Sequence, residues 1–128
     1  MKEHSCRTYF AIYGDFDSGL IIKMLNLNQI NCEEKINGLG EKSLKIGIND
    51  VYDNNVNNMI RVTLKDLYYK VDVLIDLKEK YDLEYYLEVV PSIIRNSEKV
   101  KQILSLEEDV IEFLYKTKTI HDLDYYIY

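Results

Sequence analysis

A segment in the middle of the chain, residues 54–90, changes its hydrophobic period from helical to extended within a few residues. Its first part repeats apolar residues at the i, i+3, i+4 and i+7 spacing that places them on one face of a helix. This stripe consists of Ile60, Leu64, Leu67, Val71, Leu74 and Ile75. We therefore expect one long amphipathic helix, which begins near Asn54 and loses its period after Leu77.

From Leu83 onward the hydrophobic period becomes two. Tyr85, Leu87 and Val89 follow Leu83 on one side of this segment. The other side carries Glu84, Tyr86, Glu88 and Val90. Alternation with carboxylates on one face predicts a half-buried strand over residues 83–90, and we expect Pro91 to end it.

The rest of the chain predicts three more strands and two more helices. The strands are expected at residues 9–14, 43–49 and 121–128, where apolar and polar residues alternate. One helix follows Asp17, a good N-cap, and ends near residues 26–28. The other begins at the capping box formed by Ser105 and Glu108. We expect residues 29–42 to be the least structured, and residues 94–104 fit either a short helix or a packed loop.

The predicted elements follow the order β-α-β-α-β-α-β. Such alternation favours a parallel sheet covered on both faces. Buried parallel strands are continuously apolar, however, whereas Glu84, Glu88 and Asp124 require water. The prediction is therefore an α+β two-layer sandwich in a single domain of residues 1–128, with a four-stranded mixed sheet and all helices on one face.

The charge of the chain restricts its partners. A net charge of −6 and a pI near 4.9 argue against binding to nucleic acid or to an anionic membrane, and they permit a basic partner. No segment approaches the ~20 apolar residues of a membrane span, and the first eight residues hold no apolar signal region. We expect a cytoplasmic protein in which Cys6 and Cys32 are free thiols.

No residue pattern indicates catalysis, a metal or a cofactor. Asp15 and Asp17 could hold a divalent cation, but a helix cap explains them without one. His4 and His121 are expected in solvent, and nearby acids raise the thiol pKa of Cys32, which is the wrong direction for a nucleophile. Residues 38–40, Gly-Leu-Gly, lack the remainder of a phosphate loop. We predict a protein that is not an enzyme.

The face of the sheet turned away from the helices is the candidate site. It is predicted to present Glu84, Tyr86, Glu88, Asp122, Asp124, Tyr126 and Tyr128, with Tyr9 and Tyr13 beside them. An uncovered sheet face must be polar in any case, because charges there discourage aggregation. As a functional surface, it would combine rigid aromatic anchors with carboxylates that attract a basic protein.

Three segments resemble the bacterial family called domain of unknown function 4279. They are residues 9–17 (YFAIYGDFD), residues 77–84 (LKEKYDLE), and residues 104–114 together with the closing residues 122–128 (DLDYYIY). The chain departs from the family at residues 29–44, where the family has a Pro-Thr, a basic Gly-Asp segment and a Trp-Ser strand. The resemblance implies a small cytosolic bacterial protein without assigned catalytic residues, some of whose relatives lie beside polymorphic toxin genes.

Three functions are consistent with these observations. The first is a non-catalytic protein-binding domain, with an immunity protein that occludes a basic toxin domain as the candidate role. The second is a small-molecule sensing or enzymatic domain with its pocket near residues 29–42. The third is a homo-oligomeric structural module, for example a homodimer, that pairs through this outer, tyrosine-bearing face of the sheet.

Overall fold

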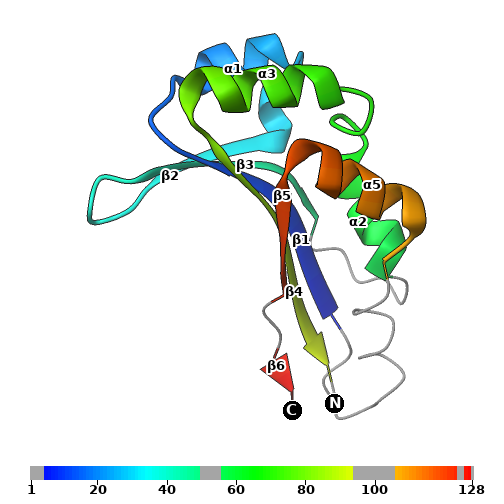
Figure 1. Ribbon diagram of the computed structural model, residues 1–128. Helices are drawn as coiled ribbons and strands as arrows, with labels where there is room; N and C mark the ends of the chain where they lie inside the picture. The colour runs from blue at the N-terminus through cyan, green and yellow to red at the C-terminus, as the bar shows by residue number, and fades with distance from the viewer. Residues whose placement is uncertain (1–4, 50–55, 94–105, 124–125, 128) are drawn as a thin grey trace.

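The computed structural model describes residues 5–49, 56–93, 106–123 and 126–127, which form a mixed sheet and a layer of helices (Figure 1). The strands are β1 (Ser5–Tyr13), β2 (Cys32–Ile36), β3 (Lys42–Asn49), β4 (Glu84–Ile93), β5 (Thr119–Leu123) and β6 (Tyr126–Ile127). The α-helices in these ranges are α1 (Ser18–Met24), α2 (Val56–Leu64), α3 (Val71–Tyr81) and α5 (Glu108–Thr117), and a 3-10 turn, η1 (Gln29–Asn31), precedes β2.

The sheet confirms the α+β class but not the predicted four strands or their alternation with helices. Five strands lie in the order β2-β3-β1-β4-β5, and β6 pairs with β4 farther along. β1 is antiparallel to β3 and β4, β2 is antiparallel to β3, and β5 and β6 run parallel to β4. The sequence did not predict β2 because four of its five residues are exposed, which leaves no apolar alternation.

Inward-facing residues of the strands form the core with the helices, which lie on one face of the sheet (Figure 1). These strand residues are Phe10, Ile12, Leu44, Ile46, Tyr85, Leu87 and Val89. The rings of Phe10 and Tyr85 lie 5.4 Å apart, and the Tyr85 hydroxyl donates a 2.6 Å hydrogen bond to the carbonyl of Leu74 in α3. Burial raises the pKa of Tyr85, so this hydroxyl keeps its proton and remains a donor.

The predicted long helix is wrong, because the chain turns between α2 and α3. A straight helix over residues 54–77 would be roughly 36 Å long, which exceeds the length of about 30 Å that a nine-residue strand reaches. Turning allows α2 to cover β1 and β3 while α3 packs beside α5. The stripe remains buried across the turn at Leu64, Leu67 and Leu74. Lys70 fixes this turn, since its ammonium donates to the carbonyl of Leu25 at the end of α1.

Gly47 allows α2 to approach the sheet closely. Its φ of +65° is unfavourable for other residues, and a Cβ at this position would lie 2.4 Å from the carbonyl oxygen of Thr63. The Thr63 hydroxyl instead donates to the carbonyl of Gly47 at 2.9 Å, and it also contacts the Thr8 hydroxyl. Thus β1, β3 and α2 meet at one buried polar contact.

The two strands nearest the C-terminus differ from their predicted limits. β4 continues through Pro91 to Ile93, instead of ending at the proline. Pro91 falls between the part of β4 that pairs with β5 and the part that pairs with β6, so its missing N–H need not interrupt either ladder. The predicted strand 121–128 begins earlier, at Thr119, and is described as two separate strands, β5 and β6.

Helix α5 begins at Glu108, with Glu107 as its N-cap and without a side-chain cap. The predicted capping box, with Ser105 as the N-cap, is therefore wrong, and Ser105 itself lies outside the described residues. The first turn is fastened by Arg61 of α2, whose guanidinium donates to both carboxylate oxygens of Asp109 at 2.6 and 2.9 Å and to Glu107 at 2.7 Å. This bidentate geometry fixes α5 against α2.

Candidate protein-binding surface

The outer face of the sheet carries side chains from β1, β3, β4 and β5, and none of the described helices covers it (Figure 1). Strand register places Tyr9 opposite Glu88 and Tyr13 opposite Glu84, while β5 places Asp122 beside Glu88. Since Phe10 and Ile12 are buried on the inner face, the prediction that Tyr9 and Tyr13 face outward is confirmed. We refer to the outward-facing residues of these strands as the tyrosine face, which consists of Tyr9, Tyr13, Lys45, Glu84, Tyr86, Glu88 and Asp122.

Tyr13 and Tyr86 form the aromatic centre of the tyrosine face. Their rings meet edge to face, with centroids 5.3 Å apart. The Tyr86 hydroxyl donates to Glu84 at 3.2 Å, and this hydrogen bond is the largest cause of the raised pKa of Tyr86. Both tyrosines are half-buried, so each ring is held by its neighbours and still reaches solvent. Two ordered rings lose little entropy when a partner packs on them.

Glu88 differs from the prediction, because only 8% of its surface is exposed. Strand register places it between Tyr9 of β1 and Asp122 of β5. Burial raises the pKa of Tyr9 and of Tyr13, and the negative charge of Glu88 raises both pKa values further. Glu88 therefore contributes charge to the face but little accessible surface.

Two cations on the tyrosine face were missed by the sequence analysis. The Lys45 ammonium lies 4.5 Å from the centroid of the Tyr9 ring, and the Arg7 guanidinium lies 5.6 Å from it. Burial, followed by the nearby charges of Lys35 and Arg7, lowers the pKa of Lys45. Arg7 of β1 and Lys45 of β3 thus lie near Tyr9, whereas Glu84, Glu88 and Asp122 lie over β4 and β5, and Glu33 of β2 lies opposite Lys45. Only the pairing of β1 with β3 brings Lys45 to Tyr9, and this pairing has no signal in the sequence.

Three of the six predicted binding residues have described side chains. Glu84 and Tyr86 lie on the tyrosine face as expected, and Glu88 is on this face but buried. Asp124 and Tyr128 lie outside the described residues. Tyr126 lies in β6, where it pairs with Ser92 of β4, and its side chain is outside the described part. Within this part, Tyr13 is an aromatic neighbour of Tyr86.

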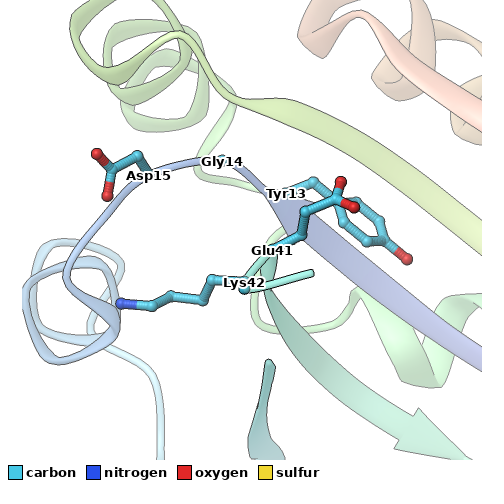
Figure 2. Close-up of a pocket in the computed structure, with 6 residues that line it drawn as sticks. Tyr13, Gly14, Asp15, Glu41 and Lys42 are labelled. Atoms are coloured by element: carbon cyan, nitrogen blue, oxygen red, sulfur yellow. The ribbon is translucent and has the colours of Figure 1, made fainter. Parts of the chain in front are cut away.

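A second candidate site is a hollow of about 310 Å³ that is lined by residues 13–15 and 40–42 (Figure 2). It overlaps the end of the segment in which we placed the alternative small-molecule pocket. Figure 2 shows Asp15 pointing away from Glu41, and Lys42 directed toward α1. There the Lys42 ammonium donates to the carbonyl of Phe16 at 2.6 Å and lies 3.6 Å from Glu34. The polar groups thus diverge, and the lysine holds the hairpin against α1.

Two further residues from the sequence analysis, Asp17 and Cys32, are accounted for by the fold. Asp17 caps α1 as predicted, with Oδ1 accepting from the amide of Gly19 at 2.9 Å. The Cys32 thiol is free, and its pKa is raised by burial and by Asp66, rather than by the adjacent acids that we expected.

The helices of the described ranges are all too short or too polar to cross a membrane.

No family model, curated protein or solved structure matches the chain.

Proposed function

We propose that this protein is a non-catalytic binding domain that recognises another protein through its tyrosine face. The observation that carries the proposal is the ordered Tyr13–Tyr86 pair on a sheet face without a covering helix. Aromatic residues that are fixed in place before binding provide contact area at low entropic cost. An uncovered face requires only polar residues, so polarity alone does not account for two packed rings at its centre.

The charge distribution favours a basic partner over β4 and β5. Glu84 and Asp122 are exposed beside Tyr86, and the buried Glu88 adds its field beneath them. A partner that places lysine or arginine here and a neutral or acidic group over Arg7 and Lys45 would match the face in sign and in orientation. The net charge of −6 would also speed its approach at low salt.

The specific role we propose is that of an immunity protein, which covers the active site of a basic toxin domain. This role rests on the resemblance to domain of unknown function 4279, which remains a prediction. The proposed setting is the cytoplasm, where the free Cys32 would remain reduced. Occlusion of a toxin requires binding but no chemistry from this chain, which agrees with the diverging polar groups of the hollow in Figure 2.

Growth protection tests this proposal. The chain would be co-expressed with the toxin domain encoded next to its gene, and colony survival would be compared for the wild type and for Tyr13→Ala combined with Tyr86→Ala. We expect the wild type to protect and the double variant to fail while it is still folded by circular dichroism. A gene without a toxin neighbour contradicts the immunity role, and full protection by the double variant contradicts the tyrosine face as the binding surface.

The alternative proposal, a homo-oligomer, uses the same face. Sedimentation distinguishes it from the binding of a different protein. If two copies pair through Tyr13 and Tyr86, the wild type will sediment as a dimer and the double variant as a monomer. A monomeric wild type at concentrations well above those in the cell leaves the face free for a different protein.

A further inference from the structure

A groove runs between helix α5 and the outer edge of β5, away from the tyrosine face. Its volume is about 720 Å³, which lies in the range of about 300–1,000 Å³ typical of ligand sites. One wall is a helical stripe of Ile111, Leu114 and Tyr115, and the other is residues 118–121 at the start of β5. Ile111 and Tyr115 are exposed, although Leu114 beside them is buried.

The backbone along this groove is available for pairing. β5 is the last strand of the sheet, and it pairs on one side with β4. Along residues 119–123, no described strand occupies its other side, so part of the amides and carbonyls of β5 face the groove. An exposed strand edge is a template for one more strand, and natural proteins usually block it with charges or a covering element. Here an apolar helix face lies beside the edge instead of a charged one.

His121 adds an unsatisfied polar group to the groove. Its partner in β4 is Leu87, which faces the helices, so the imidazole is also directed toward the helical layer. Its Nε2 atom is buried and, within the described structure, has no hydrogen-bond partner. Burial lowers the pKa of His121, so the ring is neutral at pH 7 and can donate or accept one hydrogen bond. A buried polar atom of this kind needs a partner, and an occupant of the groove can supply it.

Positive charge marks one end of the groove. Lys118 follows α5 directly, immediately before β5 begins, and Lys116 lies two residues earlier, in the last turn of α5. A strand added antiparallel to β5 runs toward this end, so its C-terminus reaches the lysines. The Lys116 ammonium is held 2.8 Å from Glu112, which leaves Lys118 as the closer match for a terminal carboxylate.

We propose that this groove binds an extended peptide segment with a free C-terminus, which adds as an antiparallel strand to β5. Alternate apolar side chains of the peptide pack on Ile111, Leu114 and Tyr115, a polar side chain meets His121, and the terminal carboxylate lies at Lys118. Main-chain hydrogen bonds give affinity in this mode of binding, and the side-chain contacts give selectivity. The site is independent of the tyrosine face, so either proposal can fail without the other.

Selection from a library of random peptides with free C-termini tests the groove. Selected peptides would be labelled, and their affinity measured by fluorescence anisotropy as the acid and as the C-terminal amide. We expect apolar residues at alternate positions of the selected peptides. Amidation of the C-terminus should weaken their affinity more than tenfold, which corresponds to about 1.4 kcal/mol. In the ¹⁵N spectrum of the protein, the amides of β5 and α5 should shift.

Three variants locate the binding. Ile111→Asp should abolish it, whereas the matched control Val62→Asp should bind as the wild type does, because both side chains are 51% exposed and Val62 lies on α2. Lys118→Gly tolerates the positive φ of +53° and should erase the preference for the free carboxylate. The proposal is overturned if no peptide is selected or if Ile111→Asp binds normally. It is also overturned if sedimentation shows a dimer that Ile111→Asp dissociates, because a second copy of the chain would then occupy the groove.

Discussion

The hydroxyl oxygens of Thr8 and Thr63 lie 2.6 Å apart in the interior of the protein, although 55 residues separate them in the chain. Thr8 is in the middle of β1 and Thr63 is near the end of α2. Thr8 also lies within 3.3 Å of the carbonyl of Met59, and Thr63 donates to the carbonyl of Gly47. This contact fixes the position of α2 over the sheet, since apolar packing alone allows a helix to slide.

Removing the Thr63 hydroxyl should destabilise the fold. In Thr63→Val, Thr8 and the carbonyl of Gly47 lose a buried partner, which costs about 1–3 kcal/mol. Thr63→Ser keeps the hydroxyl and is the matched control, with a smaller loss from the missing methyl group. Urea denaturation of both variants measures the difference. A Val variant as stable as the wild type would show that the hydroxyl contact contributes nothing to the position of α2.

The close approach of α2 to the sheet also predicts how two glycines differ. Gly47→Ala combines a left-handed backbone, worth about 1–2 kcal/mol, with a Cβ 2.4 Å from the carbonyl oxygen of Thr63, so it should lose more than that amount. Gly38→Ala places its Cβ in open space and should change stability by less than ~0.5 kcal/mol. Thermal melts of the two variants provide the comparison. Equal melting temperatures would mean that α2 does not lie against Gly47.

The inward-facing residues of the sheet could be predicted because burial leaves a period in the sequence. Phe10, Ile12, Tyr85 and Leu87 all face the helices as expected. The break between α2 and α3 could not be predicted in this way, because Leu64, Leu67 and Leu74 keep helical spacing across a turn. Their burial is satisfied by two helices as well as by one. The position of the turn depends on the length of the sheet below it and on the contact of Lys70 with Leu25.

Leu67 lies in this turn and is completely buried. Leu67→Ala should cost about 2–5 kcal/mol, the range for truncation of a large core residue. Tyr69→Ala, two residues away and 90% exposed, should leave the free energy of unfolding almost unchanged. Urea denaturation at one pH and temperature measures both. A loss below about 1 kcal/mol for Leu67→Ala would contradict its place in the core.

Asp109 should make the stability of the fold depend on pH in the acid range. Its hydrogen bonds with Arg61 and then with Tyr68 lower the pKa of this carboxyl from 3.8 to about 2. A lowered pKa stabilises the folded state above the unfolded value, and this stabilisation is lost as the pH falls through about 2.

Asp109→Asn is the variant that isolates this group. The difference in unfolding free energy between the wild type and Asp109→Asn should be largest above pH 4 and should shrink toward pH 2. Glu112→Gln, one turn along the same helix, controls for a general change in charge. A constant difference across this range would show that the ion pair does not set the pKa of Asp109.

The candidate surface was predictable in part, for the same reason as the core. Alternation placed Glu84 and Tyr86 on the outer face, but it says nothing about which strands are neighbours. The contact between Tyr13 and Tyr86 and the burial of Glu88 both arise from the pairing of β1 with β4. The neighbours of each residue on this face depend on the register between strands, which cannot be obtained from the period of either strand alone.

Salt should change how strongly individual carboxylates of the tyrosine face affect the rate at which the proposed partner binds. Glu84→Gln and Asp122→Asn remove exposed charges, so they should slow association at low salt and matter little once the screening length falls well below ~8 Å. Stopped-flow measurements at two salt concentrations test this expectation. If these changes instead alter only the rate of dissociation, and equally at both salt concentrations, the carboxylates do not steer the partner.

The central claim is that the tyrosine face binds a basic protein, and calorimetric titration with the proposed toxin partner tests it most directly. Tyr13→Ala combined with Tyr86→Ala should weaken binding more than a hundredfold, or about 2.7 kcal/mol, and Tyr86→Ala combined with Tyr126→Ala should show whether Tyr126 also contributes. Tyr69→Ala, the control, also removes a tyrosine ring but on the helical side of the protein, and it should bind with wild-type affinity. Unchanged binding by the Tyr13 and Tyr86 variant, together with loss of binding by Tyr69→Ala, would contradict the claim and move the interface to the helices.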